Sequence, residues 1–512
     1  MVNLIKKSFS PFIFSMSIVV SYVLFLIYYD STTGLDFPTK YYSYISHFAF
    51  GNKLVVSDGQ SFFYYYFISI FVKLNSALIG PNNFNEIINL SIQFGNYLLV
   101  VIGFFGLFKL YRFLGFKFNH ILIALSVLSF FPPLIYLRLT FKSELLAFTL
   151  LPWIIYYLNK AQKFELKRYE TVLVSFILSV LLTIKASVTA MILIILFIWF
   201  HKFFFKNFLI LLYVLIFSVI FLIINFNYSD LGFLTHLSDV TGRWQYKANI
   251  NFFYNINFIS LLKEPFFNVH SNSLLSIILL DTFSDYFKWF WNHKESTNYL
   301  GYGELNLTNN FYIHRYLREY IGIVLTAFFY LNLIISFKNK NEINRFIYVI
   351  PFIGIFVLAV NALGFPNLNF DPLTGDTFKT HYYAFLISIS FIHLILINKN
   401  IRKYSILLVP LFIYLMGFPK TNLNQNNELL VSKISNSNIC YLFPDQIDCK
   451  NQFVNTCGRS EVIYFEDRYL KVSNYFGYSE PFELKNKLGF KVSVRNRMEC
   501  FNRLNQGYFF SY

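Results

Sequence analysis

The chain has 512 residues, 56% of them hydrophobic and only 14% charged, with a mean hydropathy of +0.48. Soluble domains carry about 25% charged residues, so this composition excludes an ordinary soluble protein and indicates a membrane protein. The formal net charge is +16, but the basic residues lie mostly in short segments between apolar runs, as membrane topology requires, which argues against a nucleic-acid partner.

The N-terminus carries a basic pair, Lys6 and Lys7, before an apolar run over residues 9–29. This run is too long for the hydrophobic region of a typical signal peptide, and no small-x-small cleavage site follows it. We therefore expect a retained first membrane span. Because basic residues gather on the cytoplasmic side, the N-terminus should be cytoplasmic.

The later spans follow from the positions of the basic clusters. If every cluster faces the cytoplasm, the sequence predicts about eleven spans. They are residues 9–29, 91–111, 119–136, 144–159, 171–184, 187–201, 207–227, 319–337, 346–363, 382–397 and 404–418. The apolar stretch 62–80 must then be an interfacial or re-entrant helix. The stretch 171–201 must divide at Lys185, since an ammonium group in mid-membrane usually faces a polar cavity or a partner.

The expected fold is a mainly α-helical polytopic membrane domain over residues 1–418, with external loops at 30–60 and 228–318. An extracytoplasmic domain should follow over residues 419–512, where alternating stretches such as 461–465 and 491–494 predict an α/β or mostly β structure. All four cysteines lie there: Cys440, Cys449, Cys457 and Cys500. Their clustering predicts two disulfides in an oxidising compartment; a zinc site is the alternative, but the C-x2-C spacing is absent.

Carboxylates and aromatic residues gather after the first span. They are Asp30, Asp36, Asp58, Tyr41, Tyr42 and Tyr64. A carboxylate at this position can deprotonate an acceptor hydroxyl, and aromatic faces can stack on a sugar. Asp36 is the preferred base. Its alternative role is a helix N-cap before Phe37-Pro38, while Asp30 also suits an interfacial span end and Asp58 an Asp-Gly turn.

Further charged candidates lie near the outer ends of later spans. They are Arg138, Glu144, Lys185, Asp281, Asp285, His314, Arg315, Lys379 and His381. Arg138 and Glu144 can meet across a tight turn, and Lys185 should have a phosphate or carboxylate partner. Asp281 and Asp285 would share one face of a helix, but two carboxylates without a third ligand do not predict a metal. For the others, the alternative roles are membrane-edge anchors and solvated loop ends.

Several segments together resemble the GT-C membrane glycosyltransferases, which include protein O-mannosyltransferases and the aminoarabinose transferase. They are Asp58-Gly59-Gln60-Ser61-Phe62-Phe63-Tyr64, Phe131-Pro132-Pro133 with Arg138 and Glu144, Ile184-Lys185-Ala186, the run 281–287 with Trp289 and Trp291, and Lys379-Thr380-His381-Tyr382. The likeness is one of layout and is better over residues 1–320 than beyond. The paired Asp-Glu that usually follows the first helix of that superfamily is absent here.

The resemblance implies a multi-pass enzyme of the bacterial inner membrane with its C-terminal domain outside the cytoplasm. It would move a sugar from a polyprenyl-phosphate-linked donor to a glycan, lipid or protein acceptor at the outer face. The lipid bilayer and the donor are the expected partners. No cofactor is predicted, and the sequence does not support a divalent metal.

Two other functions fit a polytopic protein. A polymerase or ligase of surface polysaccharide usually concentrates arginines in outer loops between later spans, whereas here the acids cluster after the first span. A lipid-linked oligosaccharide transporter or flippase would predict charges in several spans, related halves or helices broken at matching positions. The sequence has no internal repeat and one deep lysine, Lys185, so the transferase is the expected function.

Overall fold

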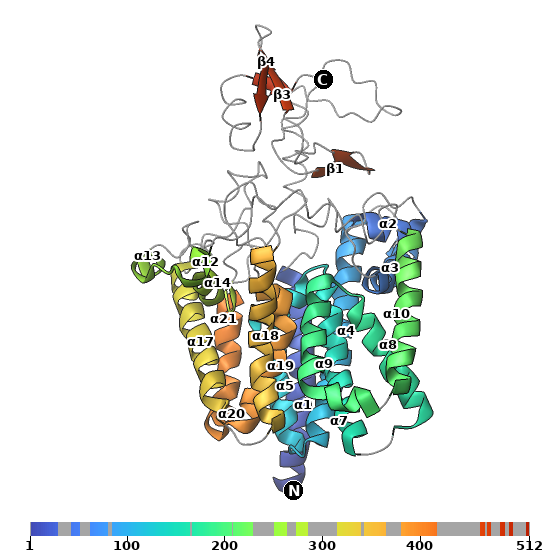
Figure 1. Cartoon of the computed structure of the whole chain (residues 1–512). Coiled ribbons are helices and arrows are strands. Elements are labelled where there is room, and N and C mark those ends of the chain that lie inside the picture. The colour runs from blue at the N-terminus through green and yellow to red at the C-terminus, as the bar shows by residue number, and fades with distance from the viewer. Residues whose placement is uncertain are drawn as a thin grey trace.

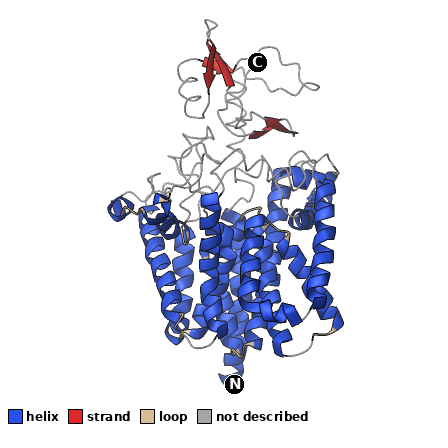
Figure 2. Cartoon of the chain, viewed as in Figure 1, coloured by secondary structure: helices blue, strands red, loops and turns tan. Residues whose placement is uncertain are grey.

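The computed structural model describes residues 2–28, 42–51, 62–79, 84–163, 166–206, 208–228, 250–263, 273–284, 315–338, 342–364 and 380–416, and the backbone of five strands between residues 461 and 510. The described residues between 2 and 416 form a bundle of helices. Figure 2 shows that the secondary structure of this bundle is helical almost throughout.

The helices are numbered in the order of the chain, and most of them lie side by side (Figure 1). They are α1 (Val2–Tyr28), α2 (Tyr42–Phe50), α3 (Phe62–Ile79), α4 (Phe84–Phe113), α5 (Phe118–Leu128), α6 (Pro132–Leu139), α7 (Glu144–Lys163), α8 (Arg168–Leu182), α9 (Ala186–Lys206), α10 (Phe208–Tyr228), α12 (Asn251–Tyr254), α13 (Phe258–Lys263), α14 (Leu274–Asp281), α17 (Arg315–Ser336), α18 (Glu342–Gly364), the 3-10 helix η6 (Thr380–Tyr383), α19 (Ala384–Ile397), α20 (Lys399–Tyr404), the 3-10 helix η7 (Ser405–Leu407) and α21 (Leu408–Met416).

The composition of these helices confirms a multi-pass membrane protein. In the described part, four helical segments are long and apolar enough to cross a bilayer: Ser10–Ile27, Ile87–Phe113, Tyr316–Ser336 and Thr380–Ile397. The pair α5 and α6, bent by 61°, makes a fifth if it is one broken span. Each of the eleven predicted spans coincides with a helix or a succession of helices, but several of these are shorter than a typical span.

Two features that the sequence predicts are a helix break at Lys185 and a helix over residues 62–80 that does not cross the membrane. The break at Lys185 is confirmed, since α8 ends at Leu182 and α9 begins at Ala186. The stretch 62–80 forms a helix, α3, which packs on α2 and α4. Figure 1 shows α2 and α3 near the end of the bundle opposite the N-terminus.

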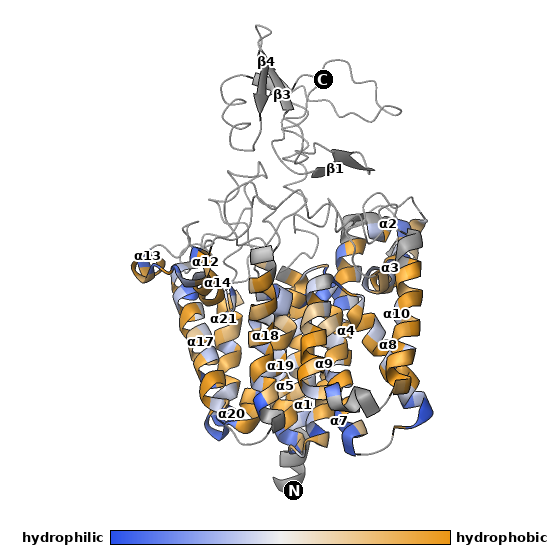
Figure 3. Ribbon diagram, viewed as in Figure 1, coloured by the Kyte–Doolittle hydropathy of each residue, from blue (hydrophilic) through white to orange (hydrophobic). Residues whose placement is uncertain are grey.

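Basic residues gather at the end of the bundle that carries the N-terminus, called here the N-terminal end. Lys160 and Lys163 lie in the last turn of α7, and Lys399, Arg402 and Lys403 lie in α20. Figure 1 places α20 at the N-terminal end, and Figure 3 shows hydrophilic residues collected there below the apolar middle of the bundle. The other end is called the opposite end.

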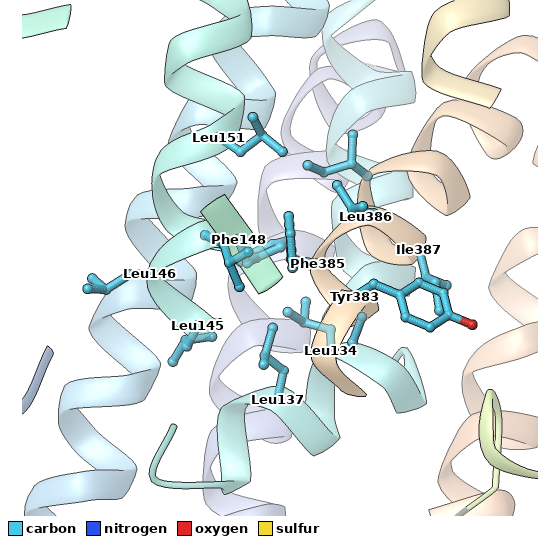
Figure 4. Packing of buried hydrophobic residues seen from close by; sticks show 14 of the residues in the cluster. Leu134, Leu137, Leu145, Leu146, Phe148, Leu151, Tyr383, Phe385, Leu386 and Ile387 are labelled. Atoms are coloured by element: carbon cyan, nitrogen blue, oxygen red, sulfur yellow. The ribbon is translucent and has the colours of Figure 1, made fainter. Parts of the chain in front are cut away.

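Helix α19 is the centre of the bundle. All its residues from Ala384 to Leu396 are buried, and it contacts α5, α6, α7 and α18. Figure 4 shows Phe385 and Leu386 of α19 packed toward Phe148 of α7, with Leu134 of α6 nearby. A helix that is apolar on every side must be enclosed by others, as observed.

The outer faces of the peripheral helices are apolar and exposed. On α10, for example, Phe208 and Leu215 are 68% and 61% exposed. In water such a surface would be costly, whereas a lipid environment removes that cost. This burial pattern therefore agrees with the composition in indicating a membrane environment.

The strands lie in the C-terminal part of the chain. β1 (Glu461–Phe465) pairs with β2 (Arg468–Val472) in an antiparallel hairpin, and β3 (Phe482–Asn486) pairs antiparallel with both β4 (Lys491–Val494) and β5 (Tyr508–Phe510). β1 and β4 coincide with the two predicted strands. The cysteines lie outside the described residues, so the disulfides stay a prediction.

Candidate functional site

The α6–α7 connection, the α8–α9 break and η6 meet at the opposite end of the bundle, where α6 and α9 both contact η6. Pro132 occupies the start of α6, where its fixed backbone angle and missing N–H are tolerated. The helix ends at Leu139, and the Thr140 hydroxyl donates to the carbonyl oxygens of Tyr136 and Leu137 at 3.0 and 3.2 Å. The chain then re-enters helix at Glu144.

Five residues from these segments form what we call the Glu144 cluster. They are Lys142, Glu144, Lys185, His381 and Tyr382. Three of them, Glu144, Lys185 and His381, are candidates predicted from the sequence. Lys142 is not among those candidates, although it lies two residues before Glu144 in a short connection between helices. Tyr382 belongs to the segment Lys379-Thr380-His381-Tyr382 but is not one of the predicted site residues.

Glu144 is the only acid of the cluster and is 0% exposed. Its Oε1 accepts a hydrogen bond from Lys185 Nζ at 2.8 Å, and the two groups form an ion pair. Its Oε2 is buried and has no hydrogen-bond partner in the part of the chain that the structure describes. A buried carboxylate oxygen without a partner is costly, so this atom is suited to accept a hydrogen bond from a ligand.

The cations of the cluster are close to an imidazole and an aromatic ring. Lys142 Nζ lies 3.5 Å from His381 Nε2, and the Tyr382 ring centroid is 4.1 Å from Lys185 Nζ and 5.8 Å from Lys142 Nζ. Aromatic faces attract cations at such distances. The cluster therefore brings two ammonium groups, an imidazole and an aromatic ring together around one buried carboxylate.

Arg138 lies beside the cluster but faces α1. It is buried, it donates to the Ser21 hydroxyl and carbonyl oxygens at 3.4 and 3.3 Å, and its guanidinium lies 5.0 Å from the Phe25 ring centroid. It also lines a small cavity of about 10 Å³ between α1, α4 and α6. The ion-pair partner of Glu144 is therefore Lys185, not Arg138 across the turn as the sequence spacing suggested.

Tyr64 is linked to the α6–α7 connection through Asn96. It is fully buried, and its hydroxyl donates to Asn96 Oδ1 at 2.8 Å. Asn96 Nδ2 in turn donates to the carbonyl oxygens of Arg138 and Thr140 at 2.6 and 2.9 Å. These bonds tie α3 and α4 to the segment that carries Lys142 and Glu144.

Asp281 lies at the last residue of α14 and bonds to the first residue of η6. Its Oδ2 accepts a hydrogen bond from the Thr380 N–H at 3.1 Å. The helix expected to carry both Asp281 and Asp285 on one face ends at Asp281. No group of three or more His, Cys, Asp or Glu suited to a metal occurs among the described residues.

The remaining predicted residues do not have described side chains. Tyr42 and Arg315 are the first residues of α2 and α17. The others lie outside the described residues and keep the status of predictions: Asp30, Asp36, Tyr41, Asp58, Asp285, His314 and Lys379.

The bundle and its charged cluster define this protein as a multi-pass helical membrane protein with a partly buried ionic site at one end. No known protein family, no curated protein and no solved structure matches the chain.

Proposed function

We propose that this protein is a membrane glycosyltransferase that moves a sugar from a polyprenyl-phosphate-linked donor to an acceptor hydroxyl. The single observation that carries the proposal is the Glu144 cluster: two lysines, a histidine and one acid at the end of an apolar helical bundle. A lipid-linked phosphate would use both parts of this surrounding: its headgroup could accept hydrogen bonds from the lysine ammonium groups, and its long chain could lie against the apolar helices.

The reaction requires charge of both signs at one place. The acceptor oxygen attacks the anomeric carbon while the bond from that carbon to the phosphate oxygen breaks, and polyprenyl phosphate leaves with the bonding electrons. Lys142 and Lys185 are positioned to stabilise the charge that develops on the departing phosphate. An ammonium group has three N–H donors, so Lys185 can bond to phosphate while it keeps Glu144.

The proton of the acceptor hydroxyl needs a base. We assign this role to the carboxylate of Asp36, because it lies in the segment that follows the first span. Glu144 would have a different role, because Lys185 already neutralises it. Its Oε2 would accept a hydrogen bond from a hydroxyl of the donor sugar or of the acceptor.

The location of the reaction follows from the distribution of charge. The basic ends of α7 and α20 lie at the N-terminal end, and short basic segments favour the cytoplasmic side of a membrane. The Glu144 cluster is at the opposite end. In the proposed orientation it would thus face the outer leaflet of a bacterial inner membrane, with residues 419–512 on the same side.

The proposal can be tested with the full-length protein in lipid nanodiscs. A panel of polyprenyl-phosphate hexoses and N-acetylhexosamines is supplied, and release of polyprenyl phosphate is measured. Donor turnover that falls in Lys185→Met, but not in the matched variant Lys160→Met at the N-terminal end, supports the proposal. No turnover of any donor, together with movement of a lipid-linked oligosaccharide across proteoliposomes, would contradict it and favour a transporter.

A further inference from the structure

We infer that Asp281 is a positioning residue: through Thr380 it holds His381 and Tyr382 against the two lysines of the Glu144 cluster. As far as it concerns catalysis, this inference rests on the proposed function. The contact itself lies between two segments far apart in the chain, and it can be tested without any substrate.

Three hydrogen bonds join Thr380 to Asp281. The Thr380 N–H donates to Asp281 Oδ2 at 3.1 Å, and the Thr380 hydroxyl lies 2.6 Å from the Asp281 carbonyl oxygen and also bonds to Oδ2. Both residues are buried, at 5% and 4% exposure. Hydrogen bonds to a charged acceptor in such surroundings are stronger than neutral ones, so this contact fixes the start of η6 firmly.

Asp281 is itself held in place by the residues that follow it. The Ser284 hydroxyl donates to Glu319 Oε1 of α17 at 2.7 Å, and the Tyr136 hydroxyl of α6 donates to the Phe283 carbonyl oxygen at 3.3 Å. A Cβ added at Gly322 of α17 would lie 2.8 Å from Ser284 Oγ, so α17 packs closely against this turn. The end of α14 is thus a fixed support, suited to position another segment.

The last residue of η6, Tyr383, is also fixed in place, by contacts with α17 and α18. The Tyr383 hydroxyl lies 3.2 Å from that of Tyr330 in α17, and a Cβ added at Gly354 of α18 would lie 2.6 Å from Tyr383 Cβ. Figure 4 shows Tyr383 at the start of α19, beside the packed core.

Between these two anchors lie His381 and Tyr382, the residues of η6 that contact Lys142 and Lys185. Loss of the Asp281 contact would release one anchor of a segment only four residues long. The expected consequence is a shift of the imidazole and the phenol ring relative to the lysines, with the rest of the bundle retained.

Hydrogen exchange measures the contact independently of function. In Asp281→Ala, the backbone amide of Thr380 loses its acceptor, and the peptide that contains residues 380–383 should exchange faster than in the wild type. Thr326→Val is the matched control, because Thr326 is buried and its hydroxyl bonds to Gly322 within its own helix. Unchanged exchange of residues 380–383 in Asp281→Ala would overturn the inference.

A double-mutant cycle then tests positioning during the reaction. Thr380→Val removes the hydroxyl, and Tyr382→Leu removes the ring over Lys185. Each should raise the donor KM by about 10-fold, the usual effect of losing one hydrogen bond to a charged group in Thr380→Val or one desolvated cation–π contact in Tyr382→Leu. The double variant should be no worse than either single one, because Thr380 acts through η6, and Thr380→Ser should restore the wild-type KM.

The outcomes separate the two proposals. If the effects of Thr380→Val and Tyr382→Leu multiply, or if Thr380→Val lowers only the melting temperature, Asp281 and Thr380 are structural and the inference is wrong. If the wild type turns over no donor, the proposed function is wrong, and the exchange of residues 380–383 alone decides whether Asp281 positions η6.

Discussion

Lys185 and Glu144 are 41 positions apart in the chain, yet Lys185 Nζ and Glu144 Oε1 are 2.8 Å apart. Lys185 follows the end of α8, and Glu144 is the first residue of α7, where the partial positive charge of the helix N-terminus also favours a carboxylate. The pair therefore joins a break between two helices to the start of a third. The ion pair with Glu144 explains why a lysine is tolerated in this apolar run, where an unpaired ammonium group would be too costly.

The first prediction concerns stability. Lys185→Met should leave the fully buried Glu144 carboxylate without its ion-pair partner. Removing one member of a buried pair costs several kcal/mol; because the Lys185 side chain is 26% exposed, we expect about 2 kcal/mol. Thermal unfolding in one detergent checks this. The double variant Lys185→Met/Glu144→Leu should recover most of the loss, and no recovery would contradict a direct interaction.

Much of the helical layout follows from the sequence because apolar runs and basic clusters are local signals. The break at Lys185 could be predicted because a charge in a long apolar run needs a polar environment. α19 could be located from its apolar composition, although the sequence does not specify which helices enclose it.

The partners within the site could not be predicted in the same way. Arg138 and Glu144 are close in sequence, but α6 ends between them, and Arg138 in α6 bonds to Ser21 of α1. Glu144 instead meets Lys185, and Asp281 meets Thr380, each from a distant segment. Such pairs depend on helix packing, which one sequence without related sequences does not reveal.

The second prediction concerns topology. Single cysteines introduced near Lys163 and Lys340 should be labelled from the cytoplasmic side, and those near Trp244 and Asp445 from the outer side. The reason is that basic helix ends stay on the cytoplasmic side. A membrane-impermeant thiol reagent applied to intact and to permeabilised cells distinguishes the two. Labelling near Asp445 from the cytoplasm would contradict both the topology and the disulfide prediction.

The third prediction concerns the cysteines. Protein isolated from an oxidising compartment should have no titratable thiol before reduction and four after it, because clustered cysteines in an external segment form disulfides. The measurement is a thiol titration of denatured protein with and without a reductant. Four free thiols before reduction would exclude the two disulfides.

The fourth prediction concerns pH and the ion pair at the N-terminal end. The hydrogen bond from Lys160, 2.5 Å from Glu170 Oε1, lowers the pKa of Glu170 below its ordinary value. A lowered folded-state pKa stabilises the protein above the unfolded pKa, and that contribution is lost as the pH falls through the folded pKa. Melting temperatures below pH 5 should therefore fall more in the wild type than in Glu170→Gln. The difference should be about 1 kcal/mol, since the pair is only partly shielded from water: the side chain of Glu170 is 7% exposed and that of Lys160 is 26% exposed.

The last prediction concerns the base. Asp36→Asn keeps the shape of the side chain but cannot take a proton, so donor turnover should fall by roughly 10²–10⁴-fold, the usual contribution of general base catalysis. Donor binding to Asp36→Asn should persist, because the phosphate would be held by Lys142 and Lys185. In contrast, Lys185→Met should bind the donor more weakly than the wild type does. Asp58→Asn is the matched control, since asparagine is also favoured in a turn before glycine. Steady-state turnover and equilibrium binding of the same donor in nanodiscs separate these effects. Normal turnover in Asp36→Asn with a loss in Asp58→Asn would transfer the role of base to Asp58, and normal turnover in both would direct the search to Asp30.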